Sequence, residues 1–152
     1  MKSMRSLLLI LVALLTTTCA KTPKDGAPRD VAIGVDVCEY CHMSVDDLER
    51  AAQWVEPDGN TRIFDEPGCL VAWLQKHPDA RGHAFFADTQ GSGWIPAAEA
   101  TFIRGASRTA MGFDVLAYRD RETAASIAAQ QDGVVLTWTT LREEGVDHAH
   151  AY

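Results

Sequence analysis

Side chains that bind soft metal ions are concentrated in one short segment of the chain, residues 38–43. The segment reads Cys38-Glu39-Tyr40-Cys41-His42-Met43. Thiolate and thioether sulfurs select Cu(I), and an imidazole nitrogen is an acceptable further ligand. Two thiols, one imidazole and one thioether so close together predict a soft-metal site, with Cu(I) as the metal.

A Cys-x-x-Cys pair by itself also fits a thiol–disulfide redox pair, half of a zinc site or a structural disulfide. A zinc site gains nothing from Met43, and Cys69 stands at a spacing that matches no usual zinc finger. A thioredoxin-like redox pair begins a long helix, whereas residues 44–48 could cap only a short one. A disulfide between Cys38 and Cys41 leaves Met43 without a role. These alternatives remain open at the level of the residues.

Further candidate ligands lie outside this segment. Met111, like Met43, stands beside residues typical of a loop. Cys69, at the predicted start of a helix, fits a small buried hydrophobic residue, with metal contact as the alternative. His148 and His150 could collect metal, although two histidines near a C-terminus also fit a plain tail.

The N-terminus has the organisation of a secretory signal. A charged start precedes an apolar run over residues 7–15, which is too short to span a membrane as a helix. Cys19 follows small residues, an arrangement that resembles the lipobox of bacterial lipoproteins, in which the cysteine is acylated. Cleavage after Ala20 without lipidation is the alternative. We expect a signal peptide over residues 1–18 and a lipidated tether over residues 19–36.

Composition narrows the function classes. The chain has 152 residues and a formal net charge of −7, so it lacks the basic surface that nucleic acid requires. If Cys19 carries lipid, Cys38, Cys41 and Cys69 remain, and an odd number in an oxidising compartment leaves at least one thiol unpaired or held by metal. Hydrolase motifs and a phosphate-binding glycine loop are absent from the sequence. We expect a binding protein rather than an enzyme.

The remaining pattern predicts two similar halves. The first half is read as a hairpin over residues 50–64, a helix over 66–76 and a strand over 84–87. The second half is read as strands over 101–103 and 113–118, a helix over 121–131 and a strand over 134–138. The predicted fold is therefore α+β, with two ββαβ-type units over residues 37–92 and 93–145 and a flexible tail over 146–152.

Matching positions in the two predicted helices support this repeat. A shift of 54 residues along the sequence places Leu70 on Ala124 and Leu74 on Ala128. We expect residues 38–43 and Met111 to lie at equivalent ends of the two units. Among the helix starts, Asp65 is expected to cap the first helix, and Thr139 is expected to cap a last short helix.

The motif is similar to the C-x-x-C-G-M type motif of the NosL family, periplasmic lipoproteins that act as copper chaperones for nitrous oxide reductase. The resemblance extends to the segment 63–70 with its Phe-Asp pair, to Ala110-Met111-Gly112 and to the closing strand 134–138. It covers residues 38 to 138. His42 stands where the family usually has glycine, and it could add a nitrogen ligand or be a solvated loop residue.

The resemblance implies carriage of Cu(I) rather than catalysis. Met43 and Met111 would be thioether ligands, Cys41 the main thiolate and Cys38 a second ligand or redox partner. The implied partner is a copper-enzyme apoprotein, such as nitrous oxide reductase, or its membrane transporter. We expect a periplasmic lipoprotein anchored through Cys19, in the outer rather than the inner membrane. The competing functions are a thiol–disulfide oxidoreductase using Cys38 and Cys41, and a lipoprotein with a structural disulfide and no metal.

Overall fold

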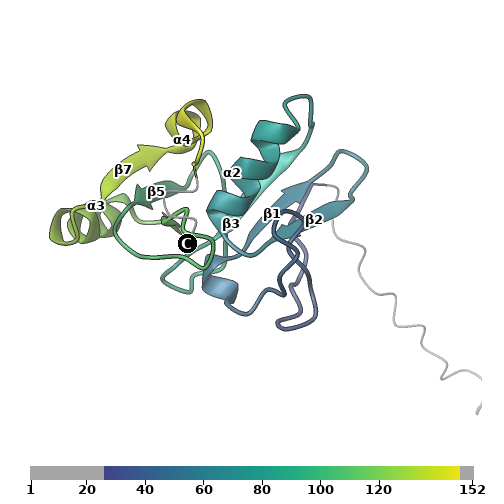
Figure 1. Cartoon of the computed structure of the whole chain (residues 1–152), viewed down its shortest axis with the longest axis horizontal. Helices are drawn as coiled ribbons and strands as arrows, with labels where there is room; N and C mark the ends of the chain where they lie inside the picture. The colour runs from purple at the N-terminus through teal and green to yellow at the C-terminus, as the bar shows by residue number, and fades with distance from the viewer. Residues whose placement is uncertain (1–25, 148–152) are drawn as a thin grey trace, which may run out of the picture.

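The computed structural model describes residues 26–147 and consists of two successive halves, which lie on opposite sides of the molecule (Figure 1). The first half contains the 3-10 helix η1 (Leu48–Arg50), β1 (Ala52–Val55), β2 (Thr61–Phe64), α2 (Pro67–Lys76), β3 (His83–Ala87) and β4 (Trp94–Pro96). The second half contains β5 (Thr101–Arg104), β6 (Val115–Tyr118), α3 (Arg121–Gln130), β7 (Val134–Thr137) and α4 (Trp138–Glu144). The predicted signal peptide, Cys19, His148 and His150 lie outside the described residues.

Both halves build the same antiparallel arrangement. The first sheet has the strand order β2-β1-β3-β4 and the second has the order β6-β5-β7. In each half the first strand is central, with its hairpin partner on one side and the strand that follows the helix on the other. The predicted α+β fold with two ββαβ-type units is confirmed. The unit boundary at residue 93 stays a prediction, and β4 extends the first sheet.

The helix α2 is the element that joins the two halves. It contacts β1 and β2 of its own half and β6 of the other half. Its first eight residues are all buried, from Pro67 to Leu74. The aromatic rings of Phe86 and Phe102, one from each half, meet edge to face with centroids 4.8 Å apart. The halves therefore share one hydrophobic core and form one packed body.

Two predicted helix caps were wrong by one or two residues. The N-cap of α2 is Glu66 rather than Asp65, because the residue before a proline is restricted to extended backbone and Pro67 occupies the first helical position. The N-cap of α4 is Thr137 rather than Thr139, because the Thr137 hydroxyl accepts a hydrogen bond from the backbone N–H of Thr140.

The two ends of the described chain are packed rather than extended. Arg29 forms an ion pair with Asp36 at 2.7 Å, and Gln53 hydrogen-bonds to both the backbone N–H and the carbonyl of Arg29. Val146, the first residue of the predicted tail, is buried in the shared core. Among residues 26–147, every helix is too short or too polar to cross a membrane.

Candidate metal centre

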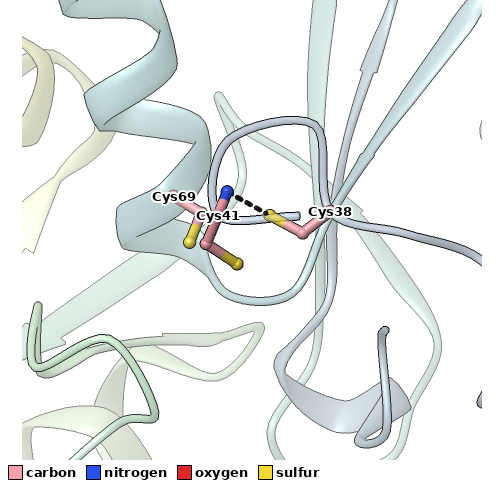
Figure 2. Close-up of side chains that lie close together, drawn as sticks. All are labelled: Cys38, Cys41 and Cys69. Atoms are coloured by element: carbon pink, nitrogen blue, oxygen red, sulfur yellow. Dashed lines mark hydrogen bonds between the residues drawn. The ribbon is translucent and has the colours of Figure 1, made fainter. Parts of the chain in front are cut away.

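Residues 38–43 form the turn of a small hairpin. The backbone N–H of Cys38 donates to the Met43 carbonyl at 2.8 Å, and Val37 pairs with Ser44 as an isolated antiparallel bridge. Inside the turn, the backbone N–H of His42 donates to the Cys38 carbonyl at 3.0 Å. The turn brings Cys41 back toward Cys38, whose Sγ accepts a hydrogen bond from the backbone N–H of Cys41 at 3.5 Å (Figure 2).

The tightness of this turn depends on one unusual backbone conformation. His42 has a φ of +62°, in the left-handed region that favours glycine. The glycine of the family motif at this position therefore has a steric explanation. The His42 side chain is exposed.

The motif loop is attached to strand β2. The backbone N–H of Glu39 donates to the Ile63 carbonyl at 2.8 Å, and the Glu39 carboxylate pairs with Arg62 at 2.7 Å. Arg62 also pairs with Glu56 at 2.9 Å and lies over the Trp73 ring. These contacts hold the loop against the first sheet and α2.

A third thiol completes the site. Cys69 lies in the first turn of α2, and its Sγ lies with those of Cys38 and Cys41 in a group whose members are all within 4.8 Å of one another. Figure 2 shows the three side chains converging from the motif loop and the start of the helix. All three are free thiols, Cys38 and Cys69 fully buried and Cys41 partly exposed. The predicted burial of Cys69 is confirmed, and the thiol also faces the motif, as the alternative of metal contact requires.

The three cysteines differ in their affinity for protons. The pKa of Cys38 is lowered to about 5, chiefly by a hydrogen bond from the Cys69 thiol and further by the backbone N–H groups of Cys41, Asp65 and Tyr40. Burial raises the pKa of Cys41 to about 11. The hydrogen bond to Cys38, with burial, raises the pKa of Cys69 far above its ordinary value. The lowered pKa favours the thiolate form of Cys38 when no metal is bound, and the role of Cys41 as the main thiolate ligand of copper stays a prediction.

The second half contributes the loop that carries Met111. The Tyr40 ring of the motif lies 6.0 Å from the Phe113 ring, and a Cβ at Gly68 would stand 2.2 Å from the Cβ of Phe113. The Met111 side chain is partly buried and packs on the shared core, as Tyr40 and Cys41 do. Met111 therefore belongs to a loop that lies against both the motif and the start of α2, while Met43 is 41% exposed.

A buried carboxyl group lies beside the thiols. Glu66 is 1% exposed, and neither of its carboxylate oxygens has a hydrogen-bond partner. Burial raises its pKa to about 7, and the neighbouring carboxylates of Asp65 and Asp114 raise it further. Glu66 helps to line a cavity of about 570 Å³, whose other charged residues are Asp46, Asp47, Arg50, Asp65 and Arg108.

The three thiols fit a soft metal ion better than any other side chains that the structure describes. Within residues 26–147 they are the one group of at least three His, Cys, Asp or Glu ligand atoms close enough to share an ion, so His42 and the acidic cavity stand apart from it. Two sulfurs bound at about 2.3 Å to one metal lie about 4.0 Å apart in a trigonal site and about 4.6 Å apart in a linear one. The observed cluster needs little closure to reach either geometry.

Comparisons with known proteins identify the fold and the family. The crystal structure of the copper chaperone NosL from Shewanella denitrificans superposes with a TM-score of 0.64 at 17% sequence identity, over 77% of this chain and 96% of that chain. At this identity the likeness concerns the fold. No curated protein matches the sequence significantly. The sequence model of the NosL family matches residues 32–146, about three quarters of the chain, and the protein is therefore a member of the NosL family.

Proposed function

We propose that this protein is a Cu(I) chaperone that works outside the cytoplasm. The observation that carries the proposal is the convergence of three free thiols whose sulfurs lie within 4.8 Å of one another. Two of these thiols, Cys38 and Cys41, belong to the loop that also carries the exposed Met43. Thiolate and thioether sulfurs prefer Cu(I) to harder metal ions. The family relative of known structure is itself described as a copper chaperone.

The protonation of the thiols favours carriage over disulfide exchange. In an oxidoreductase the exposed cysteine is the attacking thiolate, and its pKa is low because it begins a helix or faces a positive charge. Here the partly exposed thiol, Cys41, has its pKa raised to about 11, while the thiolate on Cys38 is fully buried. Only the three-residue helix η1 follows the motif closely. An enzyme that attacks substrate disulfides is therefore the weaker candidate.

The recipient in this proposal is a copper-enzyme apoprotein or the transporter that serves it, with maturation of nitrous oxide reductase as the specific case. Metal binding by thiols releases protons, so the affinity of the site for copper depends on pH. Anchoring through Cys19 would keep the chaperone at the periplasmic face of the outer membrane. The anchor is tested by radiolabelled palmitate: incorporation that persists in Cys19→Ser would refute lipidation at this residue.

Copper binding is tested by titrating the reduced protein with Cu(I) against a competing chelator. We expect one tightly bound Cu(I) per chain, loss of tight binding in Cys41→Ser, and no change in His83→Ala, which removes an exposed soft ligand outside the site. The proposal fails if the wild-type protein cannot compete with the chelator. Delivery is tested by mixing the copper-loaded protein with apo-nitrous oxide reductase and measuring copper in the separated proteins.

A further inference from the structure

We infer that Cu(I) occupies two successive positions in this site. In the outer position, Cys41 and Met43 hold copper while it is exchanged with a partner. In the inner position, Cys38, Cys41 and Cys69 retain it inside the protein. This inference rests on the proposed copper-binding function and assigns a role to Cys69, which lies outside the motif that the family resemblance identifies.

The solvent exposure of the four sulfur ligands decreases in one direction. Met43 is 41% exposed, Cys41 is partly exposed, and Cys38 and Cys69 have no exposed surface. A ligand from another protein can reach Met43 and Cys41 but not the two buried thiols. Copper bound by Cys38 and Cys69 is therefore protected from direct attack, and a partner must take it through Cys41 or Met43.

Cys41 connects the two positions. Its Sγ lies within 4.8 Å of the sulfurs of Cys38 and Cys69. The same thiol accepts a hydrogen bond from the backbone N–H of Met43, which holds it beside the outer ligand. Copper can thus remain bound to Cys41 while its other ligands change, and a metal ion that keeps one bond throughout is never released to water.

The two positions also differ in their place in the fold. Cys69 belongs to α2, whose first eight residues are buried between the two halves, so its sulfur is held inside the protein. Cys41 and Met43 belong to the motif loop at the surface, on either side of the exposed His42. A partner can therefore contact the loop ligands while the helix ligand stays in the core.

The transfer balances without any redox change. Copper remains Cu(I) throughout. On the way in, the bond to the Met43 thioether breaks as bonds to Cys38 and Cys69 form, and each thiol that is still protonated loses its proton to solvent as it binds copper. On the way out the bonds form and break in reverse order, each released thiol regains a proton, and the partner's sulfur takes the place of the last protein ligand.

The test compares Cys69→Ala, Cys69→Ser and Met43→Leu in three measurements on the reduced protein. These are Cu(I) affinity against a chelator, the rate of copper release to that chelator, and the number of sulfur ligands by X-ray absorption. Both Cys69 variants should lose affinity by about tenfold or more, release copper faster and change from three sulfur ligands to two. Met43→Leu should keep its affinity within about threefold and release copper about tenfold more slowly.

Val71→Ala is the control for loosening of the helix, because Val71 is buried on α2 and carries no ligand. It should bind and release copper like the wild type, and circular dichroism should report a folded protein for every variant. Cys69 variants that bind with wild-type affinity and an unchanged sulfur count would overturn the inner position. Met43→Leu with reduced affinity and an unchanged release rate would overturn the outer one. Failure of the wild type to bind copper would instead refute the proposed function.

Discussion

The backbone N–H of Cys41 points at the Sγ of Cys38, 3.5 Å away, and this contact distinguishes the two cysteines of the motif. Cys38 receives hydrogen bonds from backbone groups and from Cys69, which stabilise its thiolate although the side chain is fully buried. Burial raises the pKa of Cys41 to about 11, which favours its protonated form at neutral pH. The thiolate, which is the reactive form, and the solvent-accessible thiol are therefore on different residues, Cys38 and Cys41.

The rates at which the cysteines are alkylated should reflect this difference between Cys38 and Cys41. With iodoacetamide at pH 7, we expect slow labelling of all three thiols, because Cys38 is a thiolate that the reagent cannot reach and Cys41 is reachable but protonated. Labelling of Cys41 should accelerate as the pH rises toward about 11, since its thiolate fraction increases over that range. Peptide mass mapping identifies the modified residue. Preferential labelling of Cys38 near pH 7 in the folded protein would contradict the assignment.

Glu66→Gln should stabilise the protein at alkaline pH. The folded pKa of Glu66, about 7, lies above the ordinary glutamate value of 4.5, so the folded state binds a proton more tightly than the unfolded state. Stability is then fully present below about pH 4.5 and decreases as the pH rises through about 7. The loss at pH 8 is on the order of 3 kcal/mol, because each pKa unit corresponds to about 1.4 kcal/mol.

Urea unfolding at pH 4.5 and pH 8 measures this effect. Glu66→Gln should resemble the wild type at the lower pH and exceed its free energy of unfolding at the higher pH. Glu122→Gln is the matched control, because Glu122 is an exposed glutamate in the first turn of α3. A Glu66→Gln variant that is less stable than the wild type at pH 8 would mean that the carboxylate has a stabilising partner.

Gly68→Ala should destabilise the protein although alanine favours helices. Its Cβ would stand 2.2 Å from the Cβ of Phe113, so the loop that carries Met111 must move away from α2. Overpacking of this kind costs about 1–3 kcal/mol. Thermal or urea unfolding measures the change in the free energy of unfolding. Ala125→Gly, at an exposed position of α3, is the control, because it measures the difference in helix propensity between alanine and glycine without any clash. A stabilised Gly68→Ala variant would show that the loop yields without cost.

His42→Gly should leave Cu(I) affinity unchanged and keep or raise stability. Glycine relieves the strain of a φ of +62°, which costs roughly 1 kcal/mol for other residues, and the His42 ring lies outside the thiol cluster. His42→Ala removes the same imidazole but keeps the strained backbone. Both variants are titrated with Cu(I) against a chelator. A similar loss of affinity in the two variants would establish the imidazole as a ligand.

Local patterns predicted the elements of this fold well. The hairpin β1–β2 followed from the turn residues Pro57-Asp58-Gly59-Asn60 between two segments that mix apolar and polar residues. The helices α2 and α3 followed from apolar residues at helical spacing. These features depend on neighbours in the chain, which a single sequence contains. The exact starts of α2 and α4 did not follow, because several adjacent residues could act as caps and the backbone selected among them.

The sequence by itself determined the chemistry of the site: two thiols, an imidazole and a thioether in one short loop, which favour a soft metal. Only the tertiary structure decided that Cys69 joins Cys38 and Cys41 and that His42 does not. The reason is that α2 packs its first turn against the motif loop, a contact between segments distant in the chain. The Cys69 thiol and backbone N–H groups then lower the pKa of Cys38 against the effect of burial, and these contacts cannot be read from the order of the residues.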